Sequence, residues 1–162
     1  MNINETLKHY FGYDSLRPGQ QELIEGILQR KDVLGIMPTG AGKSLCYQVP
    51  ALMLDGITIV VSPLISLMTD QVKALNQTGV HAAYINSSLT ENQIRTALFY
   101  AAQGRYKIIY VAPERLNTMR FLEFACQVDI SMVTVDEAHC ISQWGQDFRC
   151  LLYTSDAADD LT

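Results

Sequence analysis

The segment MPTGAGKS, which begins at Met37, combines two glycines, a lysine and a hydroxyl side chain at the spacing of a phosphate-binding loop. Gly40 and Gly42 allow the backbone to turn its N–H groups inward around a phosphate. Lys43 is expected to reach the β- and γ-phosphates of a nucleotide, and Ser44 is expected to hold Mg²⁺. The strict pattern begins with glycine where this chain has methionine, so an ordinary Gly-rich turn is the alternative interpretation. The predicted phosphate-binding residues are Thr39, Gly40, Ala41, Gly42, Lys43 and Ser44.

A second group of chemically active side chains is the sequence DEAH, which directly follows the apolar segment ISMVTV. If that segment is a strand of an open parallel sheet, the carboxylates emerge at the sheet edge where ligands bind. Asp136 is expected to hold Mg²⁺ through water, and Glu137 to orient and deprotonate the attacking water. His139 is expected to hydrogen-bond across the cleft and to relay the nucleotide state. Alone, these residues indicate a solvated turn equally well, but together with the phosphate loop they predict one Mg–ATP site.

The elements that must position these groups alternate along the chain. Short apolar, β-branched runs predict buried strands at 33–37, 57–61, 82–85, 107–111 and 130–135. Helical patterns occur at 3–11, in a segment that begins near Pro18, and at 64–77, 91–103 and 114–125. Thr90 and Gln93 have the spacing of a capping box. This order predicts an α/β domain with a mostly parallel sheet and right-handed crossovers.

Composition sets the outer limits of this interpretation. The chain has 162 residues, about one domain's worth, with 48% hydrophobic and 18% charged residues. The sequence shows neither an apolar run long enough to span a membrane nor a signal-peptide pattern, so we expect no membrane association and a cytoplasmic location, at the nucleoid in a bacterium. The 4 cysteines form no CxxC pair, which disfavours zinc. The net charge of −5 counts mildly against nucleic-acid binding.

The phosphate loop and the DEAH sequence together resemble the nucleotide site of superfamily 2 helicases. Residues 11–20, FGYDSLRPGQ, narrow the resemblance to the RecQ family of ATP-dependent DNA helicases, because they look like its adenine-recognition motif. The resemblance implies that Gln20 bonds N6 and N7 of adenine, for which its amide has one donor and one acceptor. It also implies that Tyr13 and Arg17 sandwich the base. Leu16 stands where the family more often has phenylalanine.

Two further segments, SPLISLMTDQ and APERL, resemble the family's motifs that line the path of the single strand. The resemblance implies that Ser62, Ser66 and Arg115 contact DNA phosphates. Taken one residue at a time, two ordinary helix N-termini are the better interpretation.

The segment ISQWGQDFR, directly after DEAH, resembles the aromatic-rich loop of RecQ helicases. The resemblance implies that Trp144 and Phe148 stack on bases, at roughly 1–3 kcal/mol each, with Arg149 beside them as a further DNA contact. Gln146 replaces a histidine that is common there in the family. Core packing of Trp144 is the alternative.

The resemblance covers residues 1–149 and implies a RecA-like P-loop NTPase domain, the first motor domain of a 3′-to-5′ DNA helicase that uses Mg–ATP. The remaining residues, 150–162, match nothing in the family, and we expect them to be a foreign or divergent tail. We therefore expect a domain that is incomplete at its C-terminal end and lacks the second RecA-like domain. That domain supplies an arginine finger, whose effect on rate is about 10³–10⁵ in related NTPases.

The sequence leaves three alternatives open. The chain could be another superfamily 2 motor that acts on RNA or on duplex DNA, although the aromatic loop and FGYDSLRPGQ argue against that. It could be a nucleotide-binding module or an inert fragment that does no catalysis. Even under the helicase interpretation, we expect at most weak ATP binding, little hydrolysis and no unwinding from this chain alone. A P-loop kinase or transporter ATPase is disfavoured, because those proteins do not pair DEAH with an aromatic loop.

Overall fold

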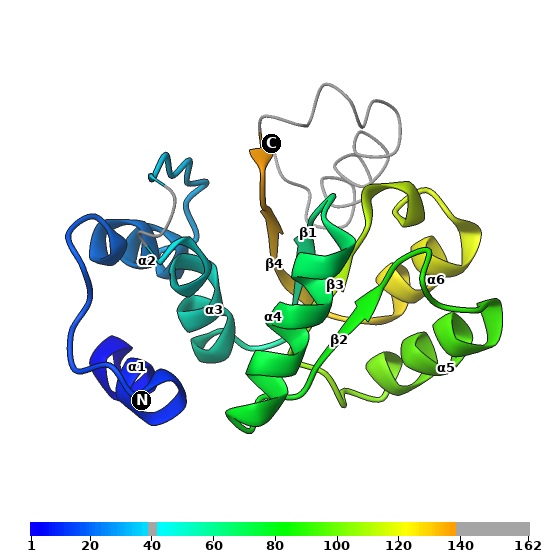
Figure 1. Cartoon of the computed structure of the whole chain (residues 1–162), viewed down its shortest axis with the longest axis horizontal. Helices are drawn as coiled ribbons and strands as arrows, with labels where there is room; N and C mark the ends of the chain where they lie inside the picture. Colours follow the sequence, from blue (N-terminus) through cyan, green and yellow to red (C-terminus); the bar gives the residue numbers. More distant parts are fainter. Residues whose placement is uncertain (39–41, 139–162) are drawn as a thin grey trace. The chain divides into compact units, whose positions relative to one another are not determined.

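The computed structural model describes residues 1–38 and 42–138 (Figure 1). The chain divides into two compact units, Met1–Asp55 and a second one from Gly56 onward. None of the helices in the described residues is both long and apolar enough to cross a membrane.

The first unit is a cluster of three helices. These helices are α1 (Ile3–Phe11), α2 (Gln20–Leu28) and α3 (Lys43–Met53). Leu7, Ile24 and Val49 supply one fully buried side chain from each helix and pack in a single cluster, which is the core of this unit. Burial of these apolar faces stabilises three short helices that would be marginal alone.

The predicted strand at 33–37 is not a strand in the structure. Val33, Leu34 and Ile36 are exposed, at 39%, 76% and 90% of their surfaces. A strand needs a neighbouring strand to bond its N–H and C=O groups, and these residues belong to no ladder of the described sheet. The apolar composition of this segment therefore predicted neither its burial nor its secondary structure correctly.

The second unit contains a four-stranded parallel sheet with the order β2-β3-β1-β4. The strands are β1 (Ile57–Val61), β2 (Ala82–Ile85), β3 (Ile108–Val111) and β4 (Ile130–Val135). Three of the predicted strand ranges are confirmed to the residue, and the fourth begins one residue later than predicted. The parallel sheet confirms the predicted α/β class.

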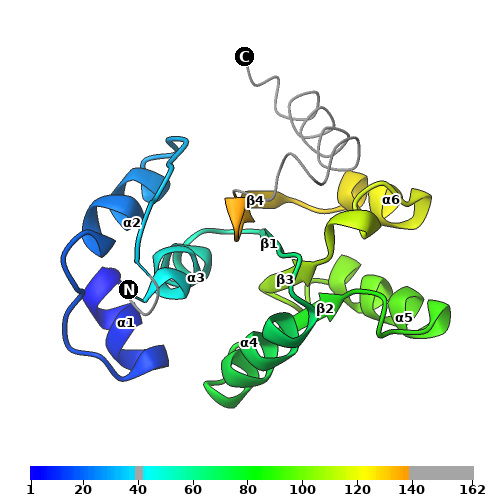
Figure 2. The same cartoon turned by 45° about the horizontal axis from the view of Figure 1, so that its top comes forward.

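Helices cover both faces of this sheet (Figure 2). They are α4 (Ile65–Gln77), α5 (Glu91–Ala102) and α6 (Met119–Gln127). The short 3-10 helix η1 (Pro113–Arg115) lies between β3 and α6. Figure 2 shows α4 on one side and α5 and α6 on the other, as right-handed crossovers between strands in this order require. The helix predicted at 114–125 is two elements, because the Thr118 side chain caps a new helix by accepting from the Phe121 N–H.

The core of the second unit lies between the sheet and α5 and α6. It is formed by Ile57, Ile59, Val61, Ile85, Ile94, Leu98, Ala101, Ile109, Val111, Leu116, Phe121 and Phe124. The strands β1 and β3 are buried along their whole length, as predicted. All six residues of β4 are only half-buried, because β4 is an edge strand that pairs with β1 alone among the described strands. The prediction of burial on both faces is wrong for this strand, and it holds only in part for β2, whose two central residues are half-buried.

Candidate nucleotide and nucleic-acid site

In the first unit, the described end of the phosphate loop forms the start of α3. Gly42 is the N-cap residue with φ of 75°, a left-handed conformation that favours glycine. Lys43 is the first helical residue and is exposed, and Ser44 follows it half-buried. No acidic residue lies in the first turn, so the positive end of the helix has no carboxylate of its own there. Thr39, Gly40 and Ala41, which were also predicted to bind phosphate, lie outside the described residues.

Gln20 connects the predicted adenine motif to this loop within the first unit. Its side chain is 1% exposed. The amide nitrogen donates to the carbonyl oxygen of Gly42 at 3.0 Å, and the amide oxygen accepts from the backbone N–H of Arg17 at 2.7 Å. Both ends of the amide therefore have protein partners, and reading adenine through Gln20 requires that these partners be exchanged. Tyr13 and Arg17, the residues predicted to sandwich the base, are exposed.

Cys46 lies one helical turn beyond the loop. Its thiol is 3.6 Å from the Met37 sulfur and 3.8 Å from the Gly42 carbonyl oxygen. Burial raises the pKa of the Cys46 thiol, and a weaker backbone hydrogen bond lowers it. The thiol is therefore kept neutral beside the phosphate loop, where a thiolate would repel a nucleotide.

In the second unit, Asp136 and Glu137 lie just beyond the C-terminal end of β4. The Asp136 N–H donates to the Val61 carbonyl oxygen at 2.9 Å, which extends the β1–β4 ladder by one residue. Glu137 has φ of 59°, and its N–H bonds the Asp136 carboxylate at 3.0 Å. A left-handed glutamate is a strained conformation of the kind that proteins keep at functional turns. Both side chains are half-buried, and His139 lies outside the described residues.

The predicted phosphate contacts of the second unit lie at the same edge of its sheet. The Ser62 N–H donates to the Val111 carbonyl oxygen at 3.2 Å, so Ser62 lies just past the end of β1 and beside the end of β3. Ser62 itself is 1% exposed, and its hydroxyl accepts from the Leu64 N–H at 3.4 Å. Ser66, in the first turn of α4, is exposed. The Ser62 hydroxyl therefore stabilises the turn between β1 and α4. Of the two serines, only Ser66 is exposed enough to contact a ligand.

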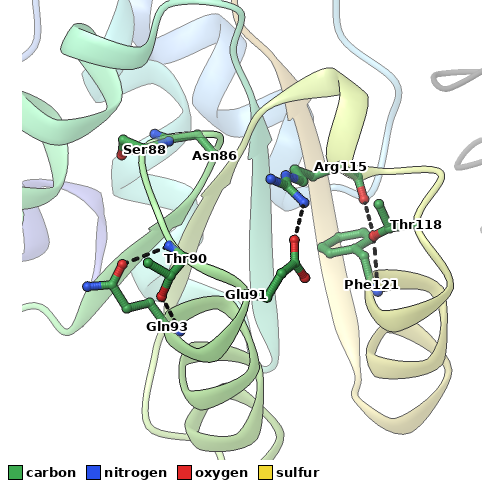
Figure 3. A network of polar contacts seen from close by, with 8 residues as sticks. All are labelled: Asn86, Ser88, Thr90, Glu91, Gln93, Arg115, Thr118 and Phe121. Carbon is green, nitrogen blue, oxygen red and sulfur yellow. Dashed lines mark hydrogen bonds and ion pairs between the residues drawn. The ribbon is translucent and has the colours of Figure 1, made fainter.

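Arg115 is the predicted phosphate contact at the end of β3, and it forms an ion pair with Glu91 (Figure 3). Sequence reasoning missed this pair, because no local spacing connects residues that follow two different strands. It also missed the bond between Gln20 and Gly42, because these residues are 22 positions apart and belong to the starts of two different helices. The remaining predicted DNA contacts, Trp144, Phe148 and Arg149, and the tail 150–162 lie outside the described residues.

The oxygen donors predicted for Mg²⁺ are of the kind that this ion prefers, a carboxylate from Asp136 and a hydroxyl from Ser44. Within the described part of the chain, no cluster of three or more His, Cys, Asp or Glu side chains could hold a metal ion. One carboxylate and one hydroxyl are a donor set that fits Mg²⁺, because this ion is usually bound through one or two carboxylates and completed by water and substrate phosphates.

Comparison with known proteins places this arrangement in a family. The model of the DEAD/DEAH box helicase family matches residues 17–157. The ATP-dependent DNA helicase RecQ of Bacillus subtilis is 53% identical over 144 residues, which are 88% of this chain and 24% of that protein. The RecQ helicase of Haemophilus influenzae is 49% identical over 89% of this chain and 23% of its own length. The chain thus spans about a quarter of the length of these curated relatives.

A solved structure, that of the DUF1998 helicase MrfA bound to DNA and AMPPNP, has a similar fold. It superposes with a TM-score of 0.67 at 18% identity, covering 85% of this chain and 20% of MrfA. This likeness confirms the predicted RecA-like architecture of a mostly parallel sheet flanked by helices. From the family model, which spans most of the sequence, we conclude that the chain belongs to the DEAD/DEAH box helicase family.

Proposed function

We propose that this chain is the ATP-binding part of a RecQ-like, ATP-dependent DNA helicase. The observation that carries the proposal is the Asp136–Glu137 turn at the C-terminal end of β4, in a chain 53% identical to a RecQ helicase over 144 residues. Parallel sheets of this class bind ligands at that edge. The positive end of α3 and Lys43 add a binding element for the phosphates of ATP.

The proposed reaction is hydrolysis of the γ-phosphoryl group of ATP. Glu137 orients a water molecule and accepts its proton as the oxygen attacks the γ-phosphorus, and ADP leaves with the electron pair of the broken P–O bond. Asp136 and Ser44 would hold Mg²⁺, which neutralises charge on the phosphate oxygens. The ammonium group of Lys43 stabilises the negative charge on the β- and γ-phosphates.

The proposed nucleic-acid partner is single-stranded or partly duplex DNA. Support comes from the DNA-helicase relatives and from the position of Ser66 and Arg115 at one edge of the sheet. In the whole protein, we propose 3′-to-5′ unwinding that requires a second RecA-like domain to supply an arginine finger to the transition state.

Calorimetry of Mg–ATP binding tests the nucleotide site. We expect the chain to bind ATP, and Lys43→Ala to weaken binding by about tenfold or more, since charge-assisted bonds to phosphate contribute about 1.5–3 kcal/mol. The matched control is Lys31→Ala, which removes an exposed lysine outside the loop and leaves affinity unchanged. We expect Gln20→Ala to lower the preference for ATP over GTP.

Two results would contradict the proposal. Equal binding of ATP by the wild type and Lys43→Ala would mean that the loop does not bind the phosphates. Binding that depends on Lys43 but gives no phosphate release, with or without single-stranded DNA, would identify a nucleotide-binding module without catalysis.

A further inference from the structure

The charge of Arg115 is balanced at the place where β2 and β3 end. Arg115 closes the helix η1, which follows β3, and Glu91 is the first residue of α5, which follows β2. Nη1 of Arg115 lies 3.3 Å from Oε1 of Glu91 (Figure 3). The Arg115 side chain is 22% exposed and that of Glu91 67%. A mostly buried cation is thus balanced by a carboxylate that stands largely in water.

The backbone beneath Arg115 is fixed by Thr118. The Thr118 hydroxyl donates to the Arg115 carbonyl oxygen at 2.8 Å and accepts from the Phe121 N–H at 3.4 Å (Figure 3). Phe121 is 1% exposed and belongs to the core. Because its backbone is anchored in this way, Arg115 can change its partner only by rotating its side chain.

The backbone beneath Glu91 is equally constrained. Thr90 and Gln93 form a capping box, with the Thr90 N–H donating to the Gln93 side chain at 2.8 Å and the Gln93 N–H donating to the Thr90 hydroxyl at 3.2 Å. Before it, the buried Asn86 side chain accepts from the N–H and the hydroxyl of Ser88 (Figure 3). The ion pair therefore joins two side chains that project from rigid turns.

The guanidinium of Arg115 is not fully satisfied by this one carboxylate. Its Nε is buried and has no hydrogen-bond partner within the described residues. A guanidinium has five N–H donors. The ion pair with Glu91 involves only the Nη1 nitrogen of Arg115 and the Oε1 oxygen of Glu91. A phosphate, which has several acceptor oxygens, would satisfy the guanidinium better than Glu91 does.

A phosphate that approaches Arg115 also meets the negative charge of Glu91. The two anions need the same guanidinium, and like charges at this separation repel each other. We infer that Glu91 is a competing counter-ion, which holds Arg115 in the DNA-free chain and is displaced when a DNA phosphate binds. The inference rests on the proposed function, because it takes DNA as the source of the phosphate. If Glu91 competes in this way, it lowers DNA affinity, because the ion pair must break before Arg115 can bind a phosphate.

Fluorescence anisotropy with a labelled oligothymidylate, titrated with the full chain at low salt, tests this competition. We expect Glu91→Gln to tighten binding by about two- to fivefold, the range that exposed ion pairs span. The matched control is Glu114→Gln, which removes an exposed carboxylate from η1 itself. We expect it to tighten binding by less than half as much. Arg115→Gln weakens binding and reduces the salt slope by about 0.7, as loss of one phosphate contact on a single strand does.

The double variant Glu91→Gln/Arg115→Gln isolates the pair. If Glu91 acts through Arg115, removing Glu91 has no effect once Arg115 is gone. Glu91→Asp serves as a second variant, since it keeps the charge at the start of α5 but draws the carboxylate back by one methylene. We expect it to bind with intermediate affinity, and circular dichroism confirms that each variant is folded.

The outcomes separate this inference from the proposed function. If Arg115→Gln binds DNA like the wild type, the proposed DNA path fails and the inference fails with it. If Arg115→Gln weakens binding but Glu91→Gln weakens it too or leaves it unchanged, the DNA path stands and the competition is refuted. Equal tightening by Glu91→Gln and Glu114→Gln would show a general charge effect, which also overturns the inference.

Discussion

The side-chain nitrogen of Gln20 lies 3.0 Å from the carbonyl oxygen of Gly42, a contact between residues that are 22 positions apart. It joins the first residue of α2 to the N-cap residue of α3. The predicted base-reading side chain and the predicted phosphate loop are therefore linked by a direct hydrogen bond. A substitution at either residue therefore alters the position or the hydrogen bonding of the other.

We predict that Gly42→Ala disrupts this link. A Cβ at Gly42 would meet the Gln20 amide nitrogen, so the amide must shift away from the Gly42 carbonyl oxygen to which it donates. The left-handed φ of 75° adds a cost of about 1–2 kcal/mol for any side chain. We expect Mg–ATP affinity, measured by calorimetry, to fall by about tenfold, which corresponds to about 1.4 kcal/mol.

The matched control for that variant is Gly104→Ala. Gly104 has a similar φ of 80° and lies outside the predicted nucleotide site, and a Cβ there meets nothing within 4 Å. It should lose the same stability to strain and keep its nucleotide affinity. If both variants lost affinity equally, backbone strain and not the contact with Gln20 would be responsible.

Replacement of Glu137 should separate stability from catalysis. Because Glu137 has φ of 59°, Glu137→Gly relieves a conformation that costs about 1–2 kcal/mol and should raise the free energy of unfolding in urea. The same variant loses the proposed general base and should stop phosphate release. Glu137→Gln should stop phosphate release without the gain in stability.

The control is Arg30→Gly, at a position with φ of 63° in the first unit. It should also gain stability and leave hydrolysis intact. A Glu137→Gly protein that still hydrolyses ATP at the wild-type rate would rule out Glu137 as the base.

We predict a large loss of stability for Gly56→Ala. Gly56 has φ of 89°, and a Cβ there would lie 2.6 Å from the Asp129 carbonyl oxygen. That oxygen accepts a hydrogen bond from the Ile57 N–H at 2.8 Å, at the start of the β1–β4 pairing. The oxygen therefore cannot move away without breaking this backbone hydrogen bond. Gly79→Ala is the control, since its φ is 91° and its surroundings are open.

Gly79→Ala should cost about 1–2 kcal/mol in urea unfolding from strain alone. Gly56→Ala should cost a further 1–3 kcal/mol or so, as steric overpacking does. Equal losses would mean that the strand start adjusts freely to the added methyl group.

Stability should fall at alkaline pH because of Cys46. Burial raises the pKa of its thiol above the ordinary value, so the unfolded chain loses this proton first as pH rises. The native state then holds a proton that the unfolded chain has released, and each further rise in pH favours unfolding. The contribution is complete below the ordinary thiol pKa of about 8.5 and is lost as pH rises toward the raised one.

The measurement is the free energy of unfolding across that range for the wild type and for Cys46→Ala. The other ionisable groups are present in both proteins, so the difference in slope reports Cys46. One group contributes at most about 1.4 kcal/mol per pH unit. Parallel slopes would show that the thiol titrates alike in both states.

Much of the second unit could be predicted from its sequence. Short β-branched runs alternate with helical patterns along the sequence. Parallel strands that are buried on both faces are nearly always apolar runs of this kind, so the runs identify them. The capping box at Thr90 and Gln93 was predicted from spacing and is confirmed, because it depends on residues only three apart. Local rules succeed where the determinants are local.

The failures have the opposite cause. The segment 33–37 is apolar like the confirmed strands, but a strand exists only when another strand pairs with it, and composition does not report that partner. The candidate acids Asp136 and Glu137 were correctly expected at a strand end. The ion pair of Arg115 and Glu91 depends on strand order, since it forms between segments that follow β2 and β3, and so no reading of nearby residues could reveal it.

The Thr118 hydroxyl has a mechanical consequence. It bonds both the end of η1 and the first turn of α6, so these two segments form a single stiff joint anchored through Phe121. A displacement of the Arg115 backbone is therefore passed to α6 through the Thr118 hydroxyl. A substitution in α6 that shifts Phe121 in the core would shift the backbone of Arg115 with it.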